Sequence, residues 1–155
     1  MQTLDVLRYG HASVTAAIDA YGPDDWSRIA LGVWTAKDLL GHLGAFEARI
    51  ADVLATFVDA PVLTDLMAAD PASFNDDQAA IRHDWSVEQV IVEYRESAER
   101  LLEHARHIPA ATWREVGTIP WYGPDYSLDD LIVYQIYGHK REHVPQLTDA
   151  LGRHA

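Results

Sequence analysis

The chain has 155 residues, 48% of them hydrophobic, no cysteine, and a formal net charge of −12 at pH 7. This length predicts one domain, 1–155, and the missing cysteines exclude disulfides, thiolate ligands and a thiol nucleophile of the protein's own. The acidic balance and scattered basic residues argue against nucleic acid or membrane as a partner. We expect a cytoplasmic protein, because neither a spanning segment of roughly 20 apolar residues nor a signal peptide is seen.

Hydrophobic residues recur at helical spacing from the start of the chain. A first apolar stripe spans 4–21, and a second spans 39–57. Thr35 precedes the second stripe with Asp38 three residues on, a spacing close to that of a capping box. Pro61 is expected to close this second helix.

Two more helices follow in the second half of the chain. The third begins at Ser86, with Gln89 completing a capping box, and stops before Pro109. The fourth spans 127–151 and contains Pro145, where we expect a local kink. Strand alternation is not seen over any useful length. The predicted fold class is therefore all-α, a bundle of four helices.

Two long connections, 59–85 and 108–126, separate these helices. Connections of this length are usually crossovers, lids or binding segments. The first is long enough to cross the length of the bundle, which would make the second and third helices parallel and give an up-down-down-up order. Trp121 and Tyr122, just before the fourth helix, are candidates for a lid or a dimer contact.

Three histidines lie in phase with the apolar stripes. His139 and His143 are four residues apart, so they share one face of a helix about 6 Å apart. His42 lies on the apolar stripe of the second helix. Burying three imidazoles is costly unless each has a partner. A divalent metal would satisfy all three and leave an open coordination position.

The depth of these histidines along the helices links the site to the topology. At 1.5 Å per residue, His42 lies roughly 10 Å from the start of its helix, and His143 roughly 12 Å from the end of its own. These levels coincide only in the up-down-down-up order, because in a simple up-and-down bundle His139 would lie about 18 Å from that end. His11 lies on the apolar stripe of the first helix and is interpreted as a core histidine. The alternative is that it binds the metal or contacts one of the three ligand histidines.

Two segments around these histidines match a known pattern. Residues 34–43, WTAKDLLGHL, resemble the W-[ST]-x-K-D-x-x-x-H-L segment of the DinB-like superfamily. Residues 137–147 resemble its closing H-x-x-x-H-x-x-Q-[IL] motif. Phe74–Asn75 is similar to a crossover element of the colibactin-resistance and maleylpyruvate-isomerase-like branches.

The resemblance covers the whole chain and implies an up-down-down-up bundle. It also implies a divalent metal, nickel or zinc, bound by His42, His139 and His143. Homodimers are frequent in such a family. The chemistry implied is that of thiol-dependent transferases or isomerases that use mycothiol, bacillithiol or glutathione.

Three imidazoles with an open position would lower the pKa of a bound water or deprotonate a thiol. The leading prediction is a metal-dependent thiol S-transferase that acts on a small molecule in detoxification or stress response. A metal-dependent hydrolase and a non-catalytic metal-binding stress protein are the alternatives. The imidazoles alone do not choose the metal.

Four further residues are candidates for a direct role at this site. Glu142 would orient a ligand or pair with a neighbour, and Gln146 would line the pocket or bond a ligand imidazole. Asn75, the chain's only asparagine, would reach the site from the crossover. Tyr134 would lie near the pocket wall. Glu47, off the histidine face, is expected to make a structural contact.

Overall fold

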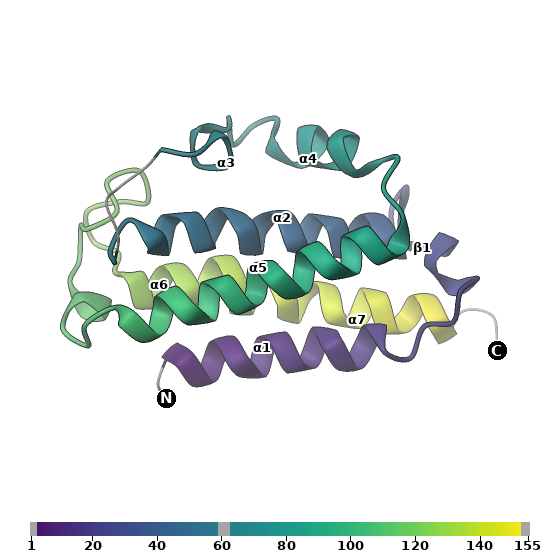
Figure 1. Ribbon diagram of the computed structural model, residues 1–155, viewed down its shortest axis with the longest axis horizontal. Coiled ribbons are helices and arrows are strands. Elements are labelled where there is room, and N and C mark those ends of the chain that lie inside the picture. The colour runs from purple at the N-terminus through teal and green to yellow at the C-terminus, as the bar shows by residue number, and fades with distance from the viewer. Residues whose placement is uncertain (1–2, 59–62, 153–155) are drawn as a thin grey trace.

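The computed structural model describes residues 3–58 and 63–152 (Figure 1). It confirms the all-α bundle, built from four long helical runs. Pro61 lies outside the described residues, and the second helix ends before it. The runs are α1 (Thr3–Ile18), α2 (Ala36–Ala55), α5 (Val87–His107), and a last run of α6 (Leu128–Ile132), the π-helix η3 (Val133–Gly138) and α7 (His139–Gly152).

Capping boxes begin three of these runs. In each, a hydroxyl side chain accepts a hydrogen bond from the backbone N–H three residues on, and the side chain there accepts one from the N-cap backbone. This exchange satisfies first-turn donors that would otherwise lack partners. The pairs are Thr35 with Asp38, Ser86 with Gln89, and Ser127 with Asp130.

The directions of the helices follow from contacts between their ends. The Thr3 hydroxyl donates to the Asp129 carboxylate, which brings the start of α1 to the start of α6. The Lys37 ammonium donates to the Trp85 carbonyl at 3.0 Å, which joins the starts of α2 and α5. Figure 1 shows α2 and α5 running one way and α1 and α6–α7 the other, the up-down-down-up order.

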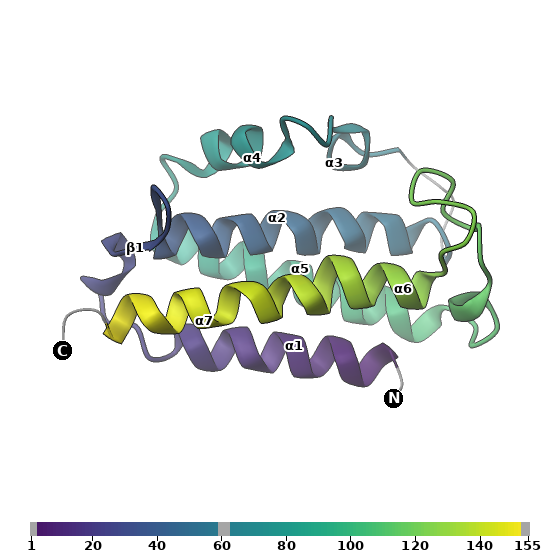
Figure 2. The ribbon, with the colours of Figure 1, turned by 180° about the vertical axis from the view of Figure 1, so that it is seen from behind.

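The crossover between α2 and α5 contains two short helices that the sequence analysis did not predict. They are α3 (Asp65–Ala68) and α4 (Phe74–Arg82), and both lie along one side of α2 (Figure 2). Phe74 is buried, and Arg82 pairs with Glu93 of α5 at 2.5 Å. The crossover therefore packs on the bundle.

Two short strands and two 3-10 helices were also not predicted from the sequence. A hairpin of β1 (Ile29–Leu31) and β2 (Trp34–Thr35) precedes α2, turning through Gly32 at φ 57. These strands are too short to show an alternating pattern. The remaining elements are the 3-10 helices η1 (Asp25–Ser27) and η2 (Thr112–Arg114).

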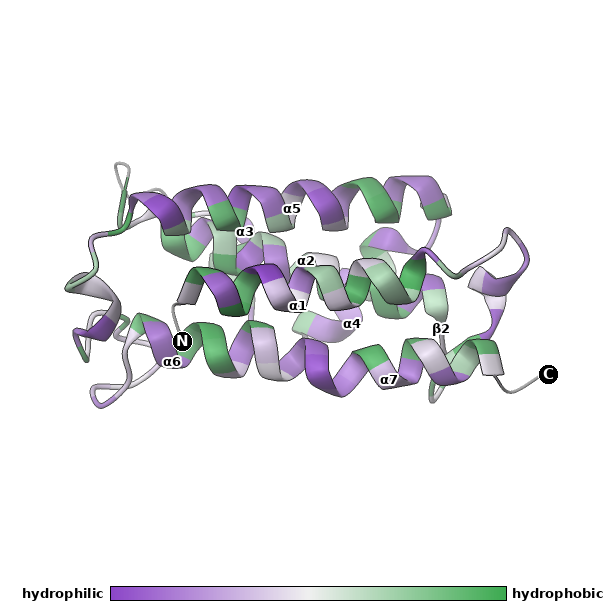
Figure 3. Ribbon diagram, turned by 90° about the horizontal axis from the view of Figure 1, so that it is seen from below, coloured by the Kyte–Doolittle hydropathy of each residue, from purple (hydrophilic) through white to green (hydrophobic). Residues whose placement is uncertain are grey.

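The interior consists of two apolar clusters. One lies toward α6 and includes Leu54, Leu101 and Leu131, and the other lies toward the hairpin and includes Leu39 and Leu147. Figure 3 shows α1 between α5 and the α6–α7 run, each carrying both hydrophobic and hydrophilic residues. In the described part of the chain, no helix has the length and apolarity to cross a membrane.

Candidate metal centre

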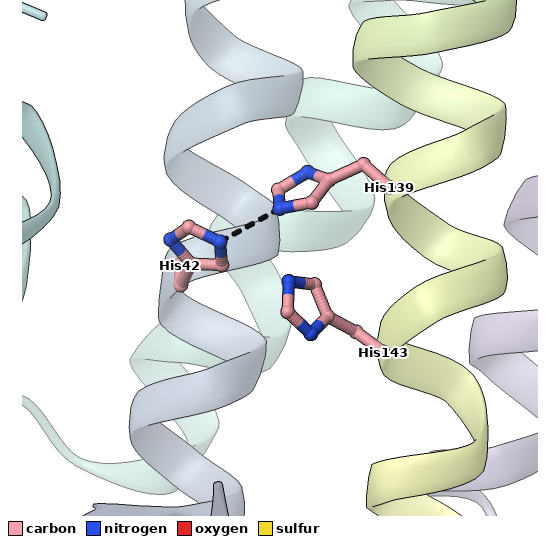
Figure 4. A group of neighbouring side chains, drawn as sticks. All are labelled: His42, His139 and His143. Atoms are coloured by element: carbon pink, nitrogen blue, oxygen red, sulfur yellow. Dashed lines mark hydrogen bonds between the residues drawn. The ribbon is translucent and has the colours of Figure 1, made fainter. Parts of the chain in front are cut away.

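His42 of α2 and His139 and His143 of α7 point toward one another across the bundle (Figure 4). One ring nitrogen from each lies within 4.8 Å of the others, and the Nε2 atoms of His42 and His139 are 2.7 Å apart. Within residues 3–58 and 63–152, this is the one group of three His, Asp or Glu side chains with ligand atoms so close together. Three imidazoles converging in this way could hold a metal ion.

The helical run that carries two of these histidines is irregular just before them. η3 ends at Gly138, and α7 begins at His139. A Cβ at Gly138 would lie 3.1 Å from the Val133 carbonyl oxygen, closer than side chains normally come. Glycine is therefore well suited to this turn. π-helical turns are rare and often occur at functional sites.

Gln146 fixes the orientation of His143. The Nδ1 atom of His143 lies 2.7 Å from the Gln146 Oε1 atom, which can only accept a hydrogen bond. Nδ1 therefore carries the proton, and Nε2 is left with its electron pair free to coordinate. The expectation that Gln146 bonds a ligand imidazole fits this contact.

The other two imidazoles are held in their uncharged form. Burial lowers the pKa of His42 to about 4, helped by the neighbouring His143. Burial also lowers the pKa of His139 to about 3, with smaller contributions from His42, His143 and Lys140. Both rings are neutral at pH 7, the state in which imidazole binds metals.

Two aromatic side chains pack against the histidine triad. The Trp34 ring centroid lies 4.9 Å from that of His42, and the Phe46 centroid lies 5.0 Å from His42 and 4.5 Å from His139. An apolar shell of this kind limits water access and lowers the local dielectric constant. It is also the environment that depresses the histidine pKa values.

The triad forms part of the wall of a cavity of about 480 Å³. Asn75, Tyr134 and Glu142 contribute to the same wall, whereas Gln146 does not. Leu31, Gln135 and Gly138 also line the cavity, although none of them was a predicted site residue. Gln135 lies on the same stripe of the last helix as His139, four residues before it, whereas Leu31 lies outside the predicted helices. A larger hollow of about 740 Å³ along α5 contains none of the three histidines.

His11 is not part of the triad. Its ring stacks on Tyr94, with centroids 5.5 Å apart, and burial lowers its pKa. The Nδ1 atom is buried and has no hydrogen-bond partner among the described residues. These contacts favour the interpretation of His11 as a core histidine.

A buried ion pair lies beside the triad. Lys140 and Glu47 meet at 2.6 Å, and their side chains are only 3% and 2% exposed. Glu47 thus makes the structural contact that was expected of it. Lys140 directly follows His139 in the sequence. Its burial was not predicted, because lysine side chains are normally exposed.

Fold and site together define a class, a four-helix bundle with a histidine triad between its second and last helices. The family model of the DinB superfamily matches residues 7–147, so the chain belongs to the DinB superfamily. This confirms the resemblance drawn from the two histidine segments. No curated protein and no solved structure gave a significant match.

Proposed function

We propose that His42, His139 and His143 bind a divalent cation, zinc or nickel, and that the protein is a metal-dependent thiol S-transferase. The observation that carries this proposal is the convergence of three ring nitrogens within 4.8 Å at the wall of a cavity. A divalent cation held there supplies Lewis acidity, which favours deprotonation of a thiol or of water at neutral pH. The expected role is detoxification or stress response.

Two features favour a thiol cosubstrate over a nucleophile from the protein. The chain has no cysteine, and among the residues that the structure describes no serine, threonine or lysine lines the cavity. A second cavity of about 330 Å³ shares Phe46, Asn75 and Gln135 with the first. The two together offer room for a small-molecule substrate beside a low-molecular-weight thiol.

The side chains around the cavity have distinct proposed roles. The Asn75 amide and the Tyr134 hydroxyl would orient a substrate through hydrogen bonds. Glu142, an exposed carboxylate in the same wall, would accept a proton. A carboxylate beside a Lewis acid also suits the activation of water, so a metal-dependent hydrolase is the second candidate.

A conjugation assay tests the proposed transfer. The metal-loaded protein is incubated with monochlorobimane and, in turn, mycothiol, bacillithiol and glutathione. We expect conjugation with at least one thiol, lost in His139→Ala and kept in His83→Ala, which removes an exposed imidazole. Hydrolysis of ester or amide substrates without conjugation would contradict transfer in favour of the hydrolase. Inactivity in both assays would favour a non-catalytic metal-binding stress protein.

We also propose that the protein is a cytoplasmic homodimer, the dimer being what the family resemblance implies. Tyr9 of α1 and Tyr134 of η3 are 63% and 60% exposed, so both rings are accessible to a second copy of the chain. Sedimentation velocity should give a dimer for the wild type and a monomer for Tyr9→Glu. A wild-type monomer at micromolar concentration would contradict this assembly.

A further inference from the structure

The second cavity lies against the same face of α2 as the triad. Its wall includes Arg49, Phe74 and Trp121. Arg49 follows His42 by seven residues, so two helical turns, or about 10 Å, separate them along α2. A molecule extending from one cavity into the other would pass Phe46, which lines both.

Aromatic contacts hold the Arg49 guanidinium in this wall. Its central carbon lies 4.7 Å from the centroid of Phe74 and 6.0 Å from that of Trp121. One nitrogen donates to the Ala69 carbonyl at 3.4 Å, a long hydrogen bond. These cation–π contacts restrain the guanidinium beside the two rings, and the Ala69 carbonyl uses only one of the five guanidinium N–H donors.

Arg49 lacks the counter-charge that most other arginines have. Six other arginines in the described part of the chain form ion pairs with a carboxylate. No carboxylate oxygen in that part of the chain lies within 4.0 Å of the Arg49 guanidinium. Burial lowers its pKa, and no charged neighbour in residues 3–58 and 63–152 contributes to this shift. A half-buried cation without a partner is costly to maintain, and a bound anion would offset that cost.

We infer that the second cavity binds the carboxylate of a small molecule, with Arg49 as its receptor and the molecule's reacting group directed toward the triad. A planar guanidinium matches a carboxylate in a two-point hydrogen bond. The formal net charge of −12 disfavours anions near the protein in general, so the attraction is local. The direction toward the triad rests on the proposed function, whereas the carboxylate site does not need a metal.

Nuclear magnetic resonance titration tests the inference with two probes of nearly the same shape. One is 3-phenylpropionate, and the other is the uncharged 3-phenylpropionamide. We expect the acid to shift the Trp121 indole and Arg49 Nε–H signals, with an affinity at least about tenfold above that of the amide, because charge-assisted hydrogen bonds are the stronger ones. The titration is repeated after metal removal, where the same result is expected.

Two variants complete the test. Arg49→Gln should weaken binding of the acid about tenfold or more and leave the amide unchanged. Arg8→Gln removes the same charge from an exposed position on α1 and should have no effect. Equal affinity for acid and amide, no binding of either, shifts confined to the triad, or an unchanged Arg49→Gln variant would each overturn the inference. A protein that binds no metal but discriminates the acid would contradict only the proposed function.

Discussion

The side chain of Gln146 decides which nitrogen of His143 carries a proton. The amide oxygen accepts from Nδ1 at 2.7 Å, which leaves Nε2 facing the other two rings. The spacing of three residues on one helix places the two side chains as neighbours, so this pair could be predicted from the sequence. The tautomer required coordinates because it depends on the direction of both side chains.

Replacing Gln146 with Ala should therefore weaken zinc binding by about 10- to 100-fold, the usual effect of losing a group that orients a metal ligand. Competition with a chromogenic chelator measures the affinity. Gln146→Glu keeps the acceptor oxygen and should bind zinc at least as well as the wild type. An Ala variant with wild-type affinity would show that the hydrogen bond is not needed for the site.

The lowered pKa values of His42 and His139 predict acid sensitivity of the metal-free protein. The ordinary pKa of both imidazoles is 6.5, whereas the folded protein lowers it to about 4 for His42 and about 3 for His139. Between pH 6.5 and these lower values, the unfolded chain therefore binds more protons than the folded protein. The free energy of unfolding should fall as pH decreases from 6.5 toward 4. One pKa unit corresponds to about 1.4 kcal/mol, so we expect a loss of at least about 2 kcal/mol.

Urea unfolding of the metal-free protein at several pH values measures this loss. The double variant His42→Gln/His139→Gln keeps the same carboxylates and provides the control. Its unfolding free energy should depend less steeply on pH over this window. Parallel curves for the two proteins would show that the imidazoles are not held neutral by the fold.

At the scale of elements, the Glu47–Lys140 pair joins α2 to α7 at the level between the two apolar clusters. α1 approaches closely there, because a Cβ at Gly10 would lie 3.1 Å from the Lys140 side chain. Tyr94 adds its ring, 5.7 Å from the ammonium. This polar layer fixes the depth of α7 against α2 and so the level of the histidines.

Glu47→Gln should destabilise the metal-free protein by about 3 kcal/mol or more, because it leaves a buried ammonium without its counter-charge. Chemical unfolding with urea measures the change. The double variant Glu47→Leu/Lys140→Met removes both charges and should recover most of the stability. A single variant as stable as the wild type would mean that water reaches the ammonium.

The elements that were predicted are those with a local signal. α2 and α5 each combine an apolar stripe with a capping box, and both features are visible over a few turns. The hairpin, α3 and α4 are too short for periodicity, and the π-turn of η3 depends on how α6 and α7 pack. The burial of the Lys140–Glu47 ion pair also depends on tertiary contacts, which the sequence alone does not show.

For the whole molecule, topology and site depend on each other. The parallel direction of α2 and α5 requires the long crossover, and the crossover brings Phe74 and Asn75 to the cavities beside α2. The histidine triad could be predicted because helical phase and this topology together place the three imidazoles at one level of the bundle. The environment of Arg49 could not be predicted, since its neighbours come from two separate connections.

Metal content is the most direct test of the central claim. The protein is purified without a metal-affinity resin and its metals are measured by inductively coupled plasma mass spectrometry, beside His139→Ala and His83→Ala. We predict close to one zinc or nickel ion per chain in the wild type and His83→Ala, and a loss of most of it in His139→Ala. A wild type that holds no divalent metal, even after incubation with zinc or nickel, would contradict the account.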